Sequence, residues 1–511
     1  MTSFLSILFL DREIAEQAES AEQPAYFPDL NLDQAIKEMI SGRQDYRLKP
    51  YFYTPLHDID QILYRQEVGK DLENPLLMGE IRAFAEQMVL VRRYLGLIDQ
   101  LYFKNHKEGW FLESVLAYGN AVEGLAAGIS SVELQSRGLK ALRGYLRDYV
   151  TSDQFCAMMA EARKIKHELT SIQYCIHIKG NGVQVRSYEA EPDYSQEVEQ
   201  TFLKFKQGAV KDYHLKIGRA GMSSVEAQIV DCVAKLYPEI FSALNRFCQA
   251  HLDFIDETVR GFDREIQFYL AYDEFISRLK QAGLKFSYPR VSNTEKTVWA
   301  YEAFDIALAN QCVALALPIV TNDFELGENE RIIVVTGPNQ GGKTTFARMF
   351  GQIHYLASLG LPVPGQEAHV FLCDQIYTHF EKEEDIRNLR GKLQDDLVRI
   401  HEILKHATSD SILILNEIFT STSLKDAAFL SKRVMEDISQ LDAFCVWVTF
   451  IDELTSYQKK TVSMVSTVLP DNPVIRTFKV IRKPADGISF AIHIAKKYRL
   501  TYEQIKERIP G

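Results

Sequence analysis

The sequence contains no apolar run that approaches the ~20 residues needed for a membrane-spanning helix. Its most apolar stretch, residues 4–10 (FLSILFL), is followed at once by Asp11, Arg12 and Glu13. No basic residue precedes this stretch and no small-residue cleavage site follows it, so a secretory signal is not expected. The pattern predicts a protein with no membrane partner.

Cysteine is sparse and shows no paired spacing. The seven cysteines are scattered over the chain, and no two of them form a C-x-x-C pair. An odd, widely spaced set indicates neither a disulfide framework nor a zinc site, and it fits buried thiols in a reducing compartment. We therefore expect a cytoplasmic protein.

Positive charge is not in excess either. The chain has 58 Lys and Arg against 69 Asp and Glu, which gives a formal net charge of −11. This balance argues against a basic surface for indiscriminate nucleic-acid binding, but it does not exclude a local basic patch. With 511 residues, 46% of them hydrophobic, the chain is long and apolar enough for more than one folded domain.

The first half of the chain is predicted to be mainly helical. Residues 1–25 end in a polar stretch and are expected to form a tail or a short helix, before a helical domain at 26–295. Apolar residues from Ile81 to Ile98 recur at spacings of three and four, which places one apolar stripe along a helix. Residues 174–188 instead alternate on both sides of Gly-Asn-Gly, which predicts a β-hairpin inserted in the helical domain.

The second part, residues 296–511, has a different pattern. Strand-like apolar runs at 331–336, 369–373, 411–415 and 444–449 alternate with helical stretches. This alternation is typical of an α/β domain with a mostly parallel sheet.

Residues 337–344 (GPNQGGKT) match the phosphate-loop pattern G-x-x-x-x-G-K-[ST]. The match lies between a strand-like run and a helical stretch, which is the context that the pattern requires. Backbone N–H groups and the helix N-terminus surround an anion there, Lys343 neutralises the β- and γ-phosphates, and the Thr344 hydroxyl can ligate Mg²⁺. The expected nucleotide-binding residues are Gly337, Pro338, Asn339, Gln340, Gly341, Gly342, Lys343, Thr344 and Thr345.

An acidic residue is expected where a neighbouring strand of such a domain ends. The run 411–415 leads directly into Asn416 and Glu417. Glu417 is therefore the candidate that orients and deprotonates the attacking water, and with Lys343 it forms the predicted catalytic pair. Asn416 stands where an aspartate that holds magnesium is expected, and with Thr344 it forms the predicted metal site. Its amide oxygen can still ligate a metal, but it carries no charge.

These segments resemble the ATPase domain of the MutS family of DNA mismatch repair proteins. The resemblance rests on TGPNQGGKTTFARM at the phosphate loop, ILILNEIFTSTSLKDA around Asn416 and FCVWVTF in the next strand. Residues 54–68 are similar to the start of the family's helical core domain. The resemblance covers roughly residues 26–511 and indicates a short form without the family's mismatch-recognition and connector domains. The expected fold is an elongated helical core and lever domain followed by an ABC-type P-loop ATPase.

The resemblance also implies cofactors, partners and further site residues. It implies ATP and Mg²⁺ as cofactors, duplex or branched DNA as a partner, and a homodimer that sandwiches two ATP molecules between its ATPase domains. A terminal helical dimerisation region would follow Pro484. The adenine would border 318–322, with the family's aromatic stacker falling at Ile319. The stretch that reaches the partner's γ-phosphate would fall at Arg390, Gly391 and Lys392, where a cation can replace the family's serine.

Three departures from the family pattern indicate slow turnover. Asn416 replaces an aspartate, Phe450 replaces a histidine, and Gly391 falls at the position of the signature serine. Arg390 and Lys392 also have a simpler interpretation, as solvated residues that begin a helix at about 393–406.

One basic segment lies inside the helical domain, where the family inserts its DNA clamp, here at about 189–222. Residues 204–219 carry a net charge of +4, and such cations can contact phosphates without reading sequence. Acidic residues at 189–199 precede them, so mutual pairing of the two runs is an equally open interpretation. The candidate nucleic-acid contacts are Lys204, Lys206, Lys211, Lys216 and Arg219.

Three functions are compatible with the sequence. The first is a dimeric MutS-like ATPase that couples its nucleotide state to movement of its levers on DNA in repair or recombination. The second is a nucleotide-gated scaffold with little turnover, which Asn416 and Phe450 favour. The third keeps the ATPase and acts on structured RNA or a ribosome, because a basic segment does not distinguish duplex DNA from RNA.

Overall fold

The computed structural model describes residues 4–180, 182–189, 201, 222–381, 391–469, 472–485 and 501–506. The chain forms two compact units, each assembled from segments that are distant in sequence. Unit 1 comprises residues 1–4, 71–135 and 139–263, and unit 2 comprises residues 5–70, 136–138 and 264–511. The functional domain ranges expected from sequence, 1–25, 26–295 and 296–511, stay predictions.

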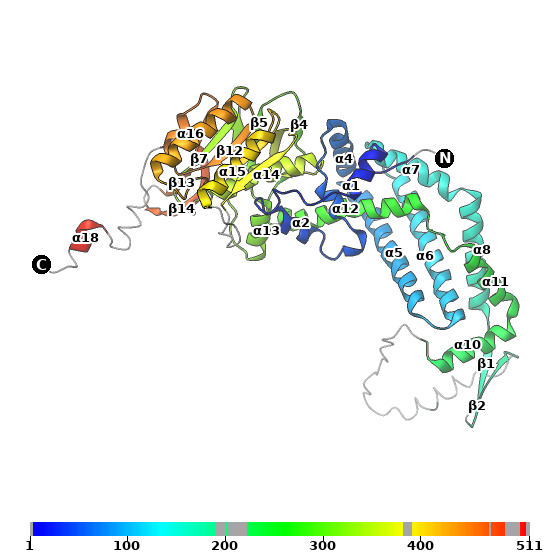
Figure 1. The fold of residues 1–511 in the computed structure, drawn as a ribbon. Helices are drawn as coiled ribbons and strands as arrows, with labels where there is room; N and C mark the ends of the chain where they lie inside the picture. Colours follow the sequence, from blue (N-terminus) through cyan, green and yellow to red (C-terminus); the bar gives the residue numbers. More distant parts are fainter. Residues whose placement is uncertain are drawn as a thin grey trace. The chain divides into compact units, whose positions relative to one another are not determined.

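The described residues of unit 1 form helices and one hairpin (Figure 1). Ile81, Phe84, Met88 and Val91 form a buried stripe along α5, at the spacing that the sequence indicates. This stripe exists because residues three and four apart lie on one face of a helix. The helices of unit 1 are α5 (Pro75–Gln100), α6 (Lys104–Ser130), most of α7 (Arg137–Val150), α8 (Asp153–Ser171), α10 (Ser224–Leu236), α11 (Pro238–Ala250) and the start of α12 (Glu257–Gln281).

The predicted hairpin is present as β1 (Tyr174–Lys179) and β2 (Gly182–Ser187), which pair antiparallel. Residues 224–281 form three successive helices, α10, α11 and α12. Pro238 begins α11, because proline lacks an amide proton and suits the first helical turn. A second break, at residues 251–256, separates α11 from α12.

Unit 2 begins with the most apolar stretch of the sequence. Ile7, Leu8 and Phe9 are almost fully buried. The Arg65 guanidinium donates a hydrogen bond from Nε to the Leu8 carbonyl at 2.9 Å and lies 4.9 Å from the centre of the Phe9 ring. The helices before the sheets are α1 (Arg12–Glu19), α2 (Leu32–Met39), η1 (Gln44–Tyr46), α3 (Lys49–Tyr53) and most of α4 (Ile59–Leu72).

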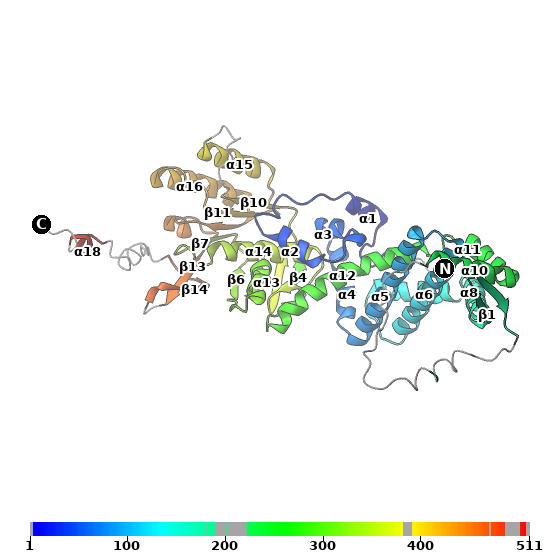
Figure 2. The same cartoon turned by 90° about the horizontal axis from the view of Figure 1, so that it is seen from below.

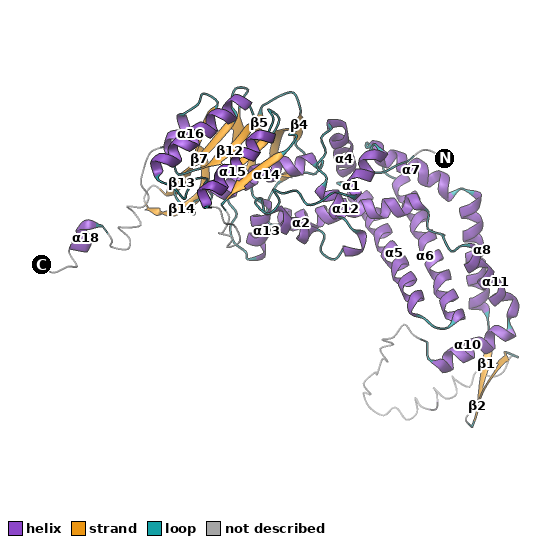
Figure 3. Cartoon of the chain, in the orientation of Figure 1, coloured by secondary structure: helices purple, strands orange, loops and turns teal. Residues whose placement is uncertain are grey.

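The main sheet of unit 2 has six described strands, shown as arrows in Figures 2 and 3. Five of them are parallel and the last pairs antiparallel, which confirms a mostly parallel sheet. The order is β10 (Ile376–Phe380), β11 (Ile412–Asn416), β12 (Phe444–Val448), β7 (Ile332–Thr336), β13 (Thr461–Leu469) and β14 (Asn472–Arg482).

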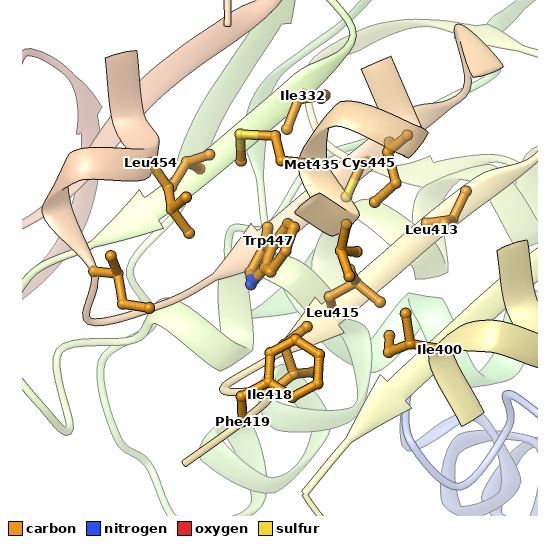
Figure 4. Close-up of a cluster of buried hydrophobic side chains, with 14 of the residues drawn as sticks. Ile332, Ile400, Leu413, Leu415, Ile418, Phe419, Met435, Cys445, Trp447 and Leu454 are labelled. Atoms are coloured by element: carbon orange, nitrogen blue, oxygen red, sulfur yellow. The ribbon is translucent and has the colours of Figure 1, made fainter. Parts of the chain in front are cut away.

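Helices cover both faces of this sheet, so its central strands read as continuous apolar runs. On one face, α15 (Lys392–His406) and α16 (Leu424–Leu441) bury a cluster around Trp447 (Figure 4). Leu413, Leu415 and Cys445 lie in the same cluster. On the other face, α14 (Lys343–Ser358) packs on β11 and β12.

One strand that the sequence pattern places in the main sheet lies in a second sheet. The apolar run at 369–373 lies in β9 (Glu367–Phe371), which pairs with β4 (Arg290–Ser292) and β5 (Val298–Ala303). In the main sheet the neighbour of β11 is β10, whose sequence IYTHF is less apolar. The remaining elements are β3 (Phe286–Ser287), α13 (Ile306–Ala314), β6 (Asn322–Leu326), β8 (Val363–Pro364), η2 (Asp452–Ser456) and α18 (Tyr502–Lys506).

Within the described residues, no helix combines the length and the apolar content that crossing a membrane requires.

Candidate functional site

Three chain segments with polar residues meet at the carboxyl edge of the parallel sheet. β7 leads into the phosphate loop, β11 ends at Asn416, and β12 leads into Thr449 and Phe450. The strand register places Asn416 opposite Val448, and Val448 opposite Val335. Open parallel sheets bind ligands at this edge, because the loops that follow the strands converge there.

The phosphate loop requires glycine at two positions where side chains would collide with backbone. Gly337 has a φ of +116°, and a Cβ there would lie 2.7 Å from the Ser466 carbonyl oxygen. At Gly341 a Cβ would lie 2.9 Å from the Pro338 carbonyl oxygen and closer still to the Ser466 hydroxyl. That hydroxyl donates to the Gly341 carbonyl at 2.6 Å, so β13 anchors the loop from the side.

Lys343 is the first residue of α14 and is almost fully buried. Its ammonium lies 3.0 Å from the Gly337 carbonyl oxygen, 3.1 Å from Asn339 Oδ1 and 3.7 Å from Glu417 Oε1. Burial lowers the pKa of Lys343 below its usual range, and the Glu417 carboxylate opposes that shift. The loop therefore encloses a cation at the start of a helix, which is the arrangement that a polyphosphate needs.

The two expected metal ligands lie in direct contact. The Thr344 hydroxyl donates to Asn416 Oδ1 at 2.9 Å. A hydroxyl and an amide oxygen at the end of a parallel strand form an all-oxygen donor set, which suits Mg²⁺. These residues therefore fit the metal that the sequence predicts.

Glu417 lies in a strained turn just after β11. Its φ is +52°, a left-handed conformation that is rare for residues other than glycine. Its amide donates to the Val448 carbonyl at 2.9 Å, which ties the turn to β12. Side chains held in such conformations cluster at functional sites, where the surrounding structure compensates the strain.

Sequence reasoning missed a buried pair behind this turn. The Asp396 carboxylate, on α15, lies 2.9 Å from His379 Nε2 and accepts the Phe419 amide at 3.2 Å. Phe419 also has a positive φ, +61°. Asp396 thus fixes the conformation of the turn that carries Glu417. No local pattern marks His379 and Asp396, since they are 17 residues apart and meet only in the folded protein.

β14 places two further residues beside the phosphate loop. Arg476 donates from Nε to the Asn339 carbonyl at 3.2 Å, and its charge contributes to the lowered pKa of Lys343. Phe478 follows two residues later, and its Cα would lie 3.7 Å from a Cβ built on Gly342. Neither residue belongs to a recognisable motif, because a strand pattern does not reveal which loop it borders.

The other predicted residues are distributed as follows. Ile319 is half-buried in the segment before β6, and Phe450 is 46% exposed after β12. Gly391 is the N-cap of α15, and the Lys392 ammonium contacts the Glu381 carboxylate of the same chain.

Several predicted residues lie outside the described part of the chain. These are Arg390 of the signature stretch, most of the region after Pro484, and the candidate nucleic-acid contacts Lys204, Lys206, Lys211, Lys216 and Arg219.

Part of the chain is similar to known proteins. The family model for MutS domain V matches residues 333–508. A DNA mismatch repair protein MutS from Clostridium kluyveri is 30% identical over 191 residues, which are 36% of this chain and 22% of that protein. The proteins of that name from Listeria welshimeri and Caldicellulosiruptor bescii are 31% identical over 182 residues and 29% identical over 195 residues. The matches cover 35% and 37% of this chain. Each match spans about a fifth of the relative's length.

Proposed function

We propose that this chain, whose residues 333–508 match the family model for MutS domain V, is a MutS family member that binds and hydrolyses ATP. The observation that carries the proposal is the enclosure of Lys343 between the phosphate loop and Glu417, with Thr344 and Asn416 in contact beside it. This is a phosphoryl-transfer site in which charge and position, and little covalent chemistry, do the catalytic work.

Each residue has a role in this proposal. Lys343 exchanges its loop oxygens for the phosphate oxygens of ATP and neutralises their charge. Thr344 and Asn416 would hold Mg²⁺, which would supply further positive charge to the phosphates. Glu417 orients the attacking water and accepts its proton, while Asp396 keeps the turn around Glu417 in place.

Multiple-turnover phosphate release from the purified full chain tests the proposal. The wild type is expected to turn over, and Lys343→Ala to lose ATP binding. Glu417→Gln keeps the shape of the side chain but is a poor base, so it should bind ATP and lose turnover by about 10²- to 10⁴-fold. Glu328→Gln, at an exposed position in the same unit, is the matched control and should behave as the wild type.

The same experiment distinguishes the ATPase from a nucleotide-gated scaffold with little turnover. Asn416 carries no charge towards the metal, and Phe450 has no proton to exchange, so both favour a nucleotide-gated scaffold. If the wild type binds ATP without repeated turnover and Glu417→Gln behaves identically, the scaffold replaces the ATPase. If the wild type does not bind ATP at millimolar concentration, both functions are wrong.

We further propose that two copies share their ATP sites, as the ABC-type resemblance implies, and that the nucleotide state moves the helical part of the chain on DNA. The relatives support repair DNA as the partner, since all three are named DNA mismatch repair proteins. In such a dimer Lys392 would leave Glu381 and approach the partner's γ-phosphate.

Measuring the molecular mass in solution with and without ATP tests the dimer. The Glu417→Gln variant should form a dimer only when the nucleotide is present. Lys392→Ala should reduce turnover while leaving ATP affinity unchanged. A chain that stays monomeric with ATP and an unchanged rate for Lys392→Ala would contradict the shared site.

A further inference from the structure

We infer that the exposed face of the second sheet is a docking surface for an extended, arginine-rich peptide segment of a partner protein. This face belongs to unit 2, takes no part in the proposed ATP site and does not need nucleotide to bind its partner. Two observations support the inference: an aromatic stack on the exposed face, and carboxylates beside it that the described residues do not neutralise.

The second sheet buries one of its faces and exposes the other. In β5 the side chains of Val298 and Ala300 are fully buried. Trp299 is half-buried and Tyr301 is 40% exposed. In β6 the Glu325 side chain is exposed between two buried neighbours. Because successive residues of a strand point to opposite faces, Trp299, Tyr301 and Glu325 share the exposed face.

Two large aromatic rings stack on this face. The centres of the Trp299 and Tyr301 rings lie 5.1 Å apart, with 25° between their planes. The solvent face of antiparallel strands ordinarily carries polar side chains, so this pair departs from the usual alternation. None of the described lysine and arginine side chains lies over either ring. The stack therefore offers π surface that a cation can cover.

Carboxylates flank the stack on both neighbouring strands. Glu325 of β6 is the register partner of Trp299, and Glu367 of β9 is the register partner of Tyr301. Directly opposite side chains on neighbouring strands are close enough to interact. The pKa of Tyr301 is raised above its ordinary value by partial burial and by the charges of Glu325, Asp323 and Glu367. Three carboxylates thus act on the hydroxyl end of the stack.

These carboxylates lack neutralising partners among the residues that the structure describes. Glu325 and Glu367 are exposed and form no ion pair there. Asp323 accepts the Glu302 amide at 2.7 Å but pairs with no described cation. Negative charge and π surface occur together on this face, and both attract a cation.

The nearest cations of the chain are engaged or lie further along the sheet. The Lys285 ammonium pairs with the Glu302 carboxylate at 2.9 Å. Arg290 of β4 is the register partner of His369, and His369 is the register partner of Trp299, so Arg290 lies two strands away from the stack. A cation that covers the stack must therefore come from another molecule.

The chemistry of the face favours arginine in an extended segment. A guanidinium group is planar, stacks on aromatic rings and donates two parallel hydrogen bonds to a carboxylate, whereas an ammonium is a compact and more strongly hydrated charge. The acids lie on both sides of β5, so the negative charge spans about 10 Å, or two strand spacings. An extended peptide with arginine at alternate positions presents several guanidinium groups on one side and can cover this width.

Fluorescence anisotropy of the full chain tests the inference with a labelled peptide in which arginine and serine alternate, in the absence of nucleotide. The chain has a net charge of −11, so a basic peptide can also bind through charge alone. Trp299→Ala and Tyr301→Ala keep every charge and separate the two cases. We expect each to weaken binding by roughly 2- to 30-fold, as loss of a cation–π contact does. Trp299→Phe keeps a ring and should recover part of the loss.

The charge of the face is tested separately. Replacing Glu325 and Glu367 together with glutamine should weaken binding and reduce its dependence on salt. Phe429→Ala removes a ring that is 73% exposed on α16, and Glu402→Gln removes an exposed charge from α15. These two variants are the matched controls and should bind the peptide as the wild type does. Circular dichroism checks that each variant is folded.

Three outcomes would overturn the inference. The first is a wild-type chain that does not bind the arginine peptide. The second is wild-type affinity in both Trp299→Ala and Tyr301→Ala, which would show that charge alone holds the peptide. The third is equal affinity for a peptide with lysine in place of arginine, which should bind more weakly if guanidinium groups stack on the rings. None of these results depends on ATP binding, so the proposed function is tested independently.

Discussion

A single amide at the end of β11 sets the charge of the proposed metal site. Asn416 is buried, and its Oδ1 accepts the Thr344 hydroxyl, so its side chain is held at the position expected for a metal ligand. An aspartate would present the same oxygen to Thr344 and add one negative charge. Because the attraction for Mg²⁺ rises with ligand charge, the amide is the physical reason to expect weak metal binding.

Asn416→Asp should therefore strengthen the apparent Mg²⁺ affinity, on the order of tenfold, in the presence of saturating ATP. The measurement is the Mg²⁺ dependence of ATP hydrolysis, or of ATP binding if turnover is slow. Asn339→Asp, a change of the same size in the phosphate loop, serves as the control and should weaken ATP binding through repulsion of the phosphates. An unchanged Mg²⁺ midpoint in Asn416→Asp would show that Asn416 does not contact the metal.

The sequence reveals those site residues that follow one another within a motif. Lys343, Thr344, Asn416 and Glu417 could be predicted because a strand, a loop and a helix occur in a fixed order around them. Asp396 could not, because its role depends on the contact of α15 with a turn formed 23 residues later. Tertiary contacts of this kind leave no local pattern.

At the scale of elements, α5 and α12 of unit 1 are joined by an ion pair that is only partly satisfied. Arg92 Nη1 donates to Asp263 Oδ2, while Asp263 Oδ1 is buried and has no hydrogen-bond partner among the described residues. Burial raises the pKa of Asp263 to about 6, and the charge of Arg92 opposes that shift only in part. The ionised carboxylate is therefore a cost to the folded protein at neutral pH.

Because of this cost, the stability of the folded protein should fall as the pH rises. The folded pKa of Asp263 lies above the ordinary aspartate value of 3.8, so between these two pH values the folded protein binds a proton that the unfolded chain does not. The contribution of Asp263 to the free energy of unfolding is fully present below about pH 4. It is lost as the pH rises through about 6, and the total loss is ~3 kcal/mol.

Asp263→Asn, which mimics the protonated form, should be more stable than the wild type at about pH 8 and similar to it at about pH 4. Urea unfolding of the full chain measures the difference. Asp99→Asn, at an exposed position on α5, is the control and should show no such crossover. A pH-independent difference between Asp263→Asn and the wild type would contradict the raised pKa.

Two elements show where patterns mislead. Residues 1–25 are expected to form a tail or a short helix, yet Ile7 and Leu8 are buried in unit 2, where the Ile7 amide donates to the Glu265 carboxylate. The apolar run at 369–373 has the character of a central parallel strand, but β9, which contains its first three residues, belongs to the second sheet, while β10 occupies the main sheet. Hydrophobic alternation predicts that a strand exists, and long-range pairing decides which sheet it joins.

At the scale of the whole molecule, net charge works against nucleic-acid binding. A chain with a formal charge of −11 is repelled by DNA unless a local cationic segment offsets the rest. Residues 204–219, with a net charge of +4, are the strongest candidate in the sequence, and an acidic run precedes them. Binding through them would therefore depend on whether DNA phosphates displace the acidic run as the partner of these cations.

Salt dependence decides between these two interpretations. Replacing Lys204, Lys206, Lys211, Lys216 and Arg219 with glutamine should weaken duplex binding and reduce the slope of log K against log salt by up to about 4.5 units, since each phosphate contact contributes about 0.9. Fluorescence anisotropy with a labelled duplex, at several salt concentrations, measures both quantities. Neutralising the acidic run, at Glu189, Glu191, Asp193, Glu197 and Glu199, should strengthen binding if that run competes with DNA. An unchanged slope in the glutamine variant would place the DNA contacts elsewhere. Tighter binding to duplex RNA than to duplex DNA of equal length, at the same salt concentration, would favour the RNA-acting alternative.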